Sequence, residues 1–367
     1  FWLKAVASTF WLEAPRLKSY SLVSAAIAVS PNMLPFAMVA FVATFTMPAF
    51  GAIELPDDNP RTTFRNDARM FAVHWPEPLS LNASETKRPW MDVYAQPNSW
   101  ENVAIDLTIG PGGSSTRFAR TYWWVGYFAA ILYVVTVKAG EHIMNNRKPF
   151  DLKLAMTCWN LFLAVFSFLG MIRLTPQLLT ILQHFGFQYS ICRAAVKTVG
   201  DSTGIWMFLF IYSKYFELGD TAFLVLRKRP VNFLHWYHHA SVLMYCWHSY
   251  QWEMPAGIYF GTMNYTVHTI MYFYYFLACI LKKPPRWGML VTVLQLLQMV
   301  GGIYVTMSCL HVLWLQPVAN CDGYLPNVCG ALGMYMSYFL LFLSFFVNRH
   351  WHKRTNGSIQ AGTKKHQ

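Results

Sequence analysis

The feature that most constrains this chain is a series of seven long apolar segments from residue 121 onward. Each approaches the length of about 17–25 residues that a helix needs to cross a hydrocarbon core roughly 30 Å thick. The segments are, approximately, 121–137, 154–172, 204–226, 234–252, 258–281, 287–310 and 328–347. Because 55% of the 367 residues are hydrophobic and only 13% are charged, the composition excludes a soluble enzyme and a disordered protein. We expect an all-α multi-pass membrane protein with seven transmembrane helices.

The basic residues between these segments predict how the chain is oriented. Loops on the cytosolic side of a membrane collect Lys and Arg, whereas translocated loops do not. One set of alternate loops, together with the tail, carries fifteen basic residues, and the other set carries three. The C-terminus is therefore expected in the cytosol and the N-terminus in the lumen. The formal charge of +12 does not indicate a nucleic-acid-binding protein. The basic residues lie between apolar segments and do not cluster on one soluble face.

The seven segments divide the chain into three regions. Residues 1–120 form an N-terminal extension that reads as a signal peptide, a membrane anchor or a stretch foreign to the mature protein, followed by a loose lumenal segment. Residues 121–348 are expected to form the seven-helix domain, and 349–367 a basic cytosolic tail. Lys364 and Lys365 match the dilysine signal that returns membrane proteins to the endoplasmic reticulum.

Three charged residues lie inside the third apolar segment, where a charge is costly. Lys214, Glu217 and Asp220 follow one another at intervals of three, so a helix keeps them near one face. Two interpretations remain open, a buried ion-pair network that joins helices and part of a functional site. Three charges within seven residues favour the second interpretation.

The fourth and fifth segments contain histidines at helical spacing. His235, His238 and His239 occupy positions i, i+3 and i+4 of one helix face, so their imidazoles are expected to point toward one interior site. Asn264 and His268 repeat the i, i+4 spacing in the next segment. Imidazoles in such an array can bind a metal, or they can carry out nucleophilic and proton-transfer chemistry near neutral pH.

Aromatic and amide side chains continue this pattern in the fifth and sixth segments. An aromatic run that includes Tyr272 and Tyr275 is expected to form the wall of an apolar cavity. Gln295 and Gln298 are again three residues apart, and amides at this spacing either join neighbouring helices or line the site. All four side chains are therefore candidates for substrate binding.

Together these residues form four motifs that resemble the signatures of the fatty acid elongases of the endoplasmic reticulum. In chain order the motifs are Lys214-x-x-Glu217-x-x-Asp220-Thr221, His235-x-x-His238-His239, His268-x-x-Met271-Tyr272-x-Tyr274-Tyr275 and Thr292-x-x-Gln295-x-x-Gln298. The resemblance covers residues 121–352 and is greatest to the branch that acts on saturated and monounsaturated long chains. It implies a membrane enzyme of the endoplasmic reticulum whose seven helices surround an interior acyl tunnel.

The resemblance also implies the reaction. An elongase condenses a long-chain acyl-CoA with malonyl-CoA, releases CO₂ and CoA, and gives a 3-oxoacyl-CoA two carbons longer. No metal and no other cofactor are implied. The partners that it suggests besides the two substrates are membrane lipid, the reductases and dehydratase of the elongation cycle, and a second copy of the chain.

Within this family picture the histidine cluster supplies the nucleophile, because no Cys accompanies it. We expect His238 to attack the thioester and form an acyl-imidazole, although the choice between His238 and His239 is not fixed by the spacing. CoA would leave, and malonyl-CoA would decarboxylate to the carbanion that takes the acyl group. His235, His239 and His268 would orient the nucleophile, stabilise the oxyanion or move protons.

Other side chains are expected to support this reaction. Asp220 or Glu217 would fix an imidazole tautomer, and Asn264 would donate to a carbonyl or a carboxylate. Lys282 and Lys283, on the expected cytosolic side, would attract CoA phosphates or serve only to set the topology.

The cysteines make a separate prediction. Cys192 and Cys321 fall in two different loops on the expected lumenal side, where disulfides persist. Their pairing is the preferred prediction, and Cys329 is the competing partner for Cys321. Seven cysteines in 367 residues are too sparse for a disulfide-stapled secreted module.

Two other protein classes share parts of this pattern. A di-iron membrane desaturase or hydroxylase also uses an HxxHH motif, but such a site needs several histidine boxes and this chain has one. A seven-span receptor has the same number of spans and the same orientation. It offers no reason for a histidine cluster beside Lys214, Glu217 and Asp220.

Overall fold

The computed structural model describes residues 114–194, 201–314 and 321–363, and all regular secondary structure within these ranges is helical. The helices are α6 (Ser114–Thr121), α7 (Trp124–Met144), α8 (Lys153–Cys192), α10 (Asp201–Glu217), α11 (Gly219–Leu226), α12 (Phe233–Gln251), α13 (Gly257–Ile280), α14 (Gly288–Trp314) and α15 (Leu325–Thr363). The expected all-α class is confirmed for this part of the chain. The predictions for residues 1–113 and for Lys364 and Lys365 lie outside the described residues.

Each of the seven predicted apolar segments overlaps one helix or a broken pair of helices. The third segment is divided at Leu218 into α10 and α11. By length and composition, three described helices can cross a membrane, namely Lys153–Cys192, Gly288–Trp314 and Leu325–Val347. A fourth crossing is added if α6 and α7, which are bent by 69° at a short break, form one span. Hydropathy therefore supports a multi-pass membrane protein with three or four crossings in the described residues.

Two long helices that carry polar motifs, α12 and α13, do not pass this test, whereas α14, which carries Thr292, Gln295 and Gln298, does. Helix α12 contains the histidine box, and α13 contains Asn264, His268 and a run of tyrosines. Polar side chains lower the mean hydropathy of a helix even when neighbouring helices bury them. His239 and His268 are both buried, so the residues of interest for function are also the ones that weaken the hydropathy signal.

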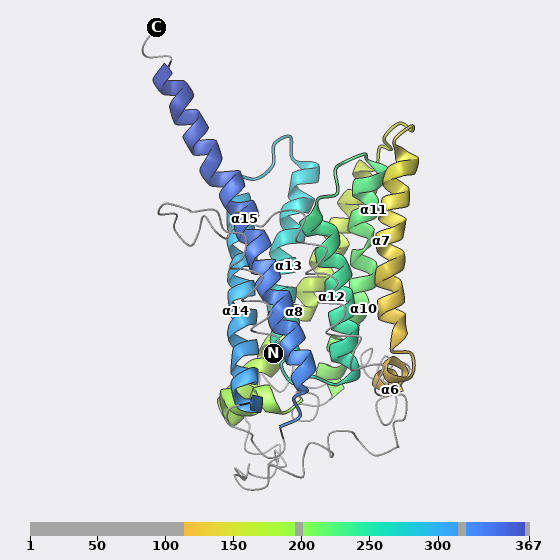
Figure 1. Ribbon diagram of the computed structural model, residues 1–367, viewed down its shortest axis with the longest axis vertical. Coiled ribbons are helices and arrows are strands. Elements are labelled where there is room, and N and C mark those ends of the chain that lie inside the picture. Colours follow the sequence, from red (N-terminus) through yellow and green to blue (C-terminus); the bar gives the residue numbers. More distant parts are fainter. Residues whose placement is uncertain (1–113, 195–200, 315–320, 364–367) are drawn as a thin grey trace, which may run out of the picture. The chain divides into compact units, whose positions relative to one another are not determined.

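Packing within the compact unit Thr44–Phe342 brings the motif helices together. Helix α13 packs along α8 and also contacts α10 and α14, while α12 packs between α7 and α10. Figure 1 shows these helices running side by side with α6 lying across the end of α7. Of the second unit, Phe1–Ala43 with Leu343–Gln367, the structure describes only the last part of α15.

The main core cluster lies where α8, α10, α12 and α13 meet. Tyr265 is 2% exposed at its centre and donates a hydrogen bond to the backbone oxygen of Trp206 at 3.1 Å. Gly170 on α8 allows this approach, because a Cβ atom there would lie 2.5 Å from the Tyr265 ring. The core therefore holds α13 against α8 in the same part of α13 that carries Asn264 and His268.

Two local features set the ends of helices. The Asn232 side chain caps α12 by accepting a hydrogen bond from the His235 amide at 2.8 Å, so the histidine box begins in the first helical turn. At the other end of the bundle, a disulfide joins Cys192 to Cys321, the pairing preferred from the sequence. Cys329 has a free thiol. The bridge ties the end of α8 to the segment that leads into α15.

Candidate active site

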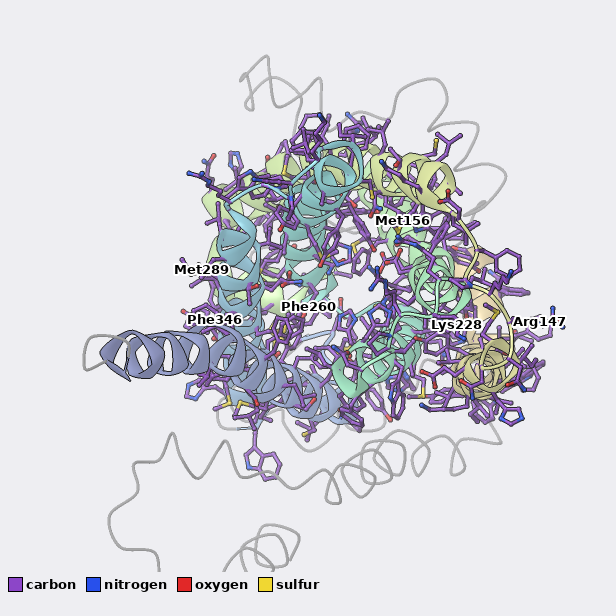
Figure 2. All side chains as sticks on the ribbon, turned by 90° about the horizontal axis from the view of Figure 1, so that it is seen from above. Arg147, Met156, Lys228, Phe260, Met289 and Phe346 are labelled. Atoms are coloured by element: carbon purple, nitrogen blue, oxygen red, sulfur yellow. A yellow bond between two sulfur atoms is a disulfide. The ribbon has the colours of Figure 1, made fainter. Side chains whose placement is uncertain are left out.

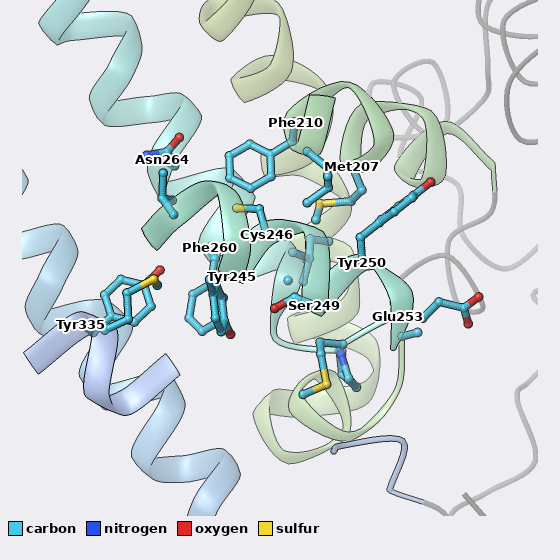
Figure 3. Close-up of a pocket in the computed structure, with 18 of the residues that line it drawn as sticks. Met207, Phe210, Tyr245, Cys246, Ser249, Tyr250, Glu253, Phe260, Asn264 and Tyr335 are labelled. Carbon is cyan, nitrogen blue, oxygen red and sulfur yellow. The ribbon is translucent and has the colours of Figure 1, made fainter. Parts of the chain in front are cut away.

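A cavity of about 180 Å³ runs between the motif helices. His238 of α12, Asn264 of α13 and Gln298 of α14 all line it, together with apolar side chains such as Met207 and Phe260. Figure 3 shows part of this lining, including Phe210, Cys246 and Asn264 on three different helices. Three predicted candidates from separate segments of the sequence therefore meet at one cavity.

The cavity extends away from His238 toward the end of α12. Its far wall includes Ser115 and Thr116 of α6 and Glu253 of the α12–α13 connection. Along α12, the distance from His238 to the last turn is about 20 Å at 1.5 Å per residue. The walls are mostly apolar over this length, so the lining suits an alkyl chain better than a polar group.

A buried polar chain connects α10 to α13 beside this cavity. The Lys214 Nζ atom lies 2.6 Å from Glu217 Oε1 and donates to Asn264 Oδ1 at 2.8 Å. The Asn264 Nδ2 atom in turn lies 3.0 Å from His268 Nε2. His268 Nδ1 is 3.7 Å from Glu217 Oε1. The four side chains, all predicted from spacing, thus contact one another in a ring: Lys214, Asn264, His268 and Glu217.

The environment of this arrangement is almost dry. The Lys214 and Glu217 side chains are only 2% and 5% exposed, and the Lys214 ammonium lies 4.4 Å above the ring centre of Phe210. Glu217 Oε1 also accepts from Ser213 Oγ at 3.2 Å. Glu217 Oε2, in contrast, is buried and has no hydrogen-bond partner among the described residues. Buried carboxylate oxygens are nearly always satisfied, so this atom marks a place where a further donor would be stabilised.

Asp220 is hydrogen-bonded to an indole and a phenol. Its Oδ1 accepts from the indole nitrogen of Trp159 at 2.7 Å, and its Oδ2 accepts from the Tyr272 hydroxyl at 2.8 Å. Asp220 therefore joins α11 to α8 and α13. Of the two carboxylates expected to orient an imidazole, Glu217 is the one that lies near a histidine.

The three imidazoles of the histidine box face different neighbours. His235 Nε2 lies 2.9 Å from Thr221 Oγ1, which also shares a 2.8 Å hydrogen bond with the Tyr133 hydroxyl. The His239 ring lies 4.6 Å from that of His235 between centroids and packs near Tyr133 of α7. His238 is the box residue that lines the cavity.

The three imidazoles lie next to one another, and His238 is the one that lines the cavity. Positions i and i+4 keep His235 and His239 on the side of α12 that packs against α7, where His235 also reaches Thr221 of α11. Position i+3 lies far enough around the helix for His238 to reach the cavity, where its ring is 5.0 Å from that of Tyr338 between centroids. The His238 and His239 rings are still only 5.3 Å apart.

The other predicted substrate-binding residues take several positions. Gln298 lines the cavity, while Gln295 Nε2 lies 3.3 Å from the Met271 sulfur. Tyr272 is buried against Asp220, but Tyr275 is 44% exposed. Lys282 and Lys283 are both exposed beyond the end of α13. The substrate-binding roles of all these residues remain predictions.

Several residues that complete the site were not singled out from the sequence. Trp159 and Tyr133 hold Asp220 and Thr221, and Tyr338 packs on His238 while bonding Ser241 at 2.6 Å. A signal existed for each, because a Trp or Tyr buried within a span needs a partner for its polar atom. The sequence alone does not reveal which partner is chosen.

Metal ligation was one chemistry that the histidine array left open. No group of three or more His, Cys, Asp or Glu side chains in the described ranges is arranged to hold a metal ion. The reason is visible in the box itself, since His235 is bonded to Thr221 and His238 faces the cavity.

The family is decided by comparison with known proteins. A model of the GNS1/SUR4 (ELO) family matches residues 118–358. The chain belongs to this family. "Putative fatty acid elongase 3" of Caenorhabditis elegans is 40% identical over 271 residues, which cover 72% of this chain and 83% of that protein. The resemblance inferred from the four motifs is therefore confirmed, and the chain is a fatty acid elongase.

Two further relatives are similar to this elongase at about the same level of sequence identity. "Very long chain fatty acid elongase 6" of Drosophila melanogaster is 41% identical over 228 residues, or 62% of this chain and 72% of the relative. "Very long chain fatty acid elongase 3" of Homo sapiens is 40% identical over 231 residues, or 62% and 84%. The family match begins inside α6 and includes every motif residue described above.

Proposed function

We propose that this elongase condenses a long-chain acyl-CoA with malonyl-CoA and is therefore an acyltransferase. The observation that carries the proposal is the meeting of His238, Asn264 and Gln298 on one apolar-walled cavity. A nucleophile at one end and an apolar-walled channel beyond it suit a reaction at the thioester end of a long acyl chain.

In the proposed first step, an unprotonated nitrogen of His238 attacks the thioester carbonyl. The carbon–sulfur bond breaks, CoA leaves as the thiolate, and a positively charged acyl-imidazolium remains, which returns to a neutral imidazole when the acyl group is transferred. His238 is preferred over His239 because His238 lines the cavity, whereas His239 is packed near Tyr133. The acyl chain would extend along the cavity toward α6.

In the second step, malonyl-CoA loses CO₂, and the electron pair of the broken bond forms a carbon–carbon bond to the acyl carbonyl. The His238 nitrogen is released, and the product is a 3-oxoacyl-CoA two carbons longer. Asn264 borders the cavity and is held by Lys214 and His268, so its amide is placed to contact a developing oxyanion. Both half-reactions would use the same imidazole in a ping-pong sequence.

The cellular setting of this function is also part of the proposal. We assign the enzyme to the membrane of the endoplasmic reticulum, with seven spans, a lumenal N-terminus and a cytosolic C-terminus. The reaction as written needs no metal and no other cofactor. Its product would pass to the reductases and dehydratase of the elongation cycle, and saturated or monounsaturated long chains are the expected substrates.

An elongation assay with labelled malonyl-CoA tests the function. Purified protein is supplied with saturated acyl-CoAs of several lengths, and labelled 3-oxoacyl products are measured. We expect activity that His238→Ala abolishes and that His311→Ala, a change at an exposed histidine of α14, leaves intact. Equal activity in all three proteins would refute the assignment of His238. Stoichiometric iron with desaturation of the acyl chain would instead support a di-iron enzyme.

A further inference from the structure

A second pocket, of about 450 Å³, lies apart from the catalytic cavity. It is formed where the α7–α8 connection meets the end of α11, and Pro149, Phe150, Asp151, Arg227, Lys228 and Arg229 line it. No lining residue is shared with the cavity that contains His238. In Figure 2 Lys228 and Arg147 lie next to each other at the edge of the bundle, away from Phe260.

Specific backbone contacts build this pocket. The Phe150 amide donates to the Leu226 carbonyl at 3.1 Å, which holds the α7–α8 connection against the end of α11. The Lys228 ammonium then donates to the carbonyls of Asn145 and Arg147 at 3.0 and 3.2 Å. Lys228 has a φ of 53°, a conformation that non-glycine residues seldom adopt. The surrounding contacts hold this conformation, so the pocket has a defined shape.

The charge of the pocket is positive and largely uncompensated. The half-buried Arg227 lies 3.1 Å from the Met156 sulfur, a weak acceptor. Neither Arg227 nor Arg229 forms a salt bridge within the described part of the chain. One oxygen of the Asp151 carboxylate accepts from the Lys153 amide at 3.2 Å, and with this carboxylate the lining residues have a net charge of +2. Two guanidinium groups are therefore available to an anion that enters the pocket.

The neighbourhood of the pocket is apolar and exposed. The exposed fractions are 50% for Phe150, 77% for Leu154 and 37% for Leu226. Phe150 lines the pocket, and Leu226 precedes Arg227 in sequence. Such side chains at the end of a membrane helix lie against acyl chains of the bilayer. An anion with an alkyl portion would satisfy both parts of this surface, whereas a free inorganic anion would use only the charges.

We propose that this pocket binds the phosphate of an anionic membrane phospholipid, with the lipid acyl chains lying along Leu154 and Leu226. Arginine forms paired hydrogen bonds with phosphate oxygens, and basic pockets at the ends of transmembrane helices bind anionic head groups. The ordered contact between the α7–α8 connection and α11 presents the arginines together. The same phosphate chemistry exists in CoA, so the test separates the two sources.

Native mass spectrometry of the full chain provides the test. The protein is taken from nanodiscs of dioleoylphosphatidylcholine containing one-fifth dioleoylphosphatidic acid, and retained lipids are counted. We expect one phosphatidic acid to be retained and Arg227→Gln with Arg229→Gln to reduce this retention by at least about tenfold. Arg147→Gln with Lys148→Gln removes the same charge from the adjoining loop without altering the pocket lining, so retention should persist.

Three results would overturn the proposal. The first is no retained phosphatidic acid on the wild-type protein, and the second is an equal loss in both double variants, which would indicate general surface charge. The third is displacement of the lipid by soluble CoA at millimolar concentration, which would assign the pocket to a substrate phosphate. Thermal unfolding of both variants confirms that they are folded, and none of these readouts depends on elongation activity.

Discussion

The buried contact between Lys214 and Glu217 makes the most quantitative prediction. Replacing Lys214 with Met keeps an alkyl chain of similar length but removes the ammonium that lies 2.6 Å from Glu217 Oε1. Glu217 Oε2 already lacks a partner among the described residues, so the carboxylate would lose its nearest charge in a dry environment. Breaking a buried pair in this way costs about 3–5 kcal/mol, because one charge remains without its partner.

This cost converts into a measurable change in the midpoint of thermal unfolding. For a folded region of 150–250 residues, each 1 kcal/mol shifts Tm by about 2–4 °C, so Lys214→Met is expected to lower Tm by roughly 6–20 °C. The measurement is thermal unfolding of the purified protein in one detergent. Adding Glu217→Gln should restore much of the loss, because the double variant contains no isolated buried charge.

A surface ion pair is the matched control. Lys138 lies 3.0 Å from Glu141, but their side chains are 57% and 34% exposed. Lys138→Met should therefore change stability by less than about 1 kcal/mol. The reasoning would be refuted if Lys214→Met shifted Tm no more than Lys138→Met, or if Glu217→Gln added its own full loss to that of Lys214→Met.

Three further predictions concern other parts of the fold. Cys192→Ser should change the mobility of the protein on a non-reducing gel and lower its stability by about 2–5 kcal/mol, because it opens the bridge to Cys321; unchanged mobility would contradict the pairing. Trp159→Phe should lower the free energy of unfolding by about 1–3 kcal/mol, because Asp220 loses one of two donors, and a smaller effect would mean that water replaces the indole. Ser115→Trp should fill the far end of the cavity and shift elongation toward shorter acyl-CoAs, and an unchanged product range would show that the chain does not reach α6.

The sequence predicted the helices and the set of polar residues better than it predicted their arrangement. Spacing of three and four placed Lys214 near Glu217 and Asn264 near His268, because neighbours on one helix depend on helix geometry alone. The contact between Lys214 and Asn264 joins two helices. Such a contact depends on how the core packs, which no local pattern specifies.

The histidine box shows the limit of reasoning from one helix. Residues at i, i+3 and i+4 share a broad face, but two neighbouring elements can divide that face between them. Here His235 contacts Thr221 of α11 and His239 packs near Tyr133 of α7, whereas His238 lines the cavity. The position of α7 depends on packing along the whole of α12, so the separation could not be read from the motif.

The central claim is tested most directly by the mass of the enzyme after incubation with an acyl-CoA alone. The account predicts a protein heavier by one acyl group, with the modification located on His238 by fragmentation and discharged when malonyl-CoA is added. His238→Ala should show no adduct, while His311→Ala should show the same adduct as the wild type. An acyl adduct that persists in His238→Ala, or that is located on any other side chain, would contradict the account.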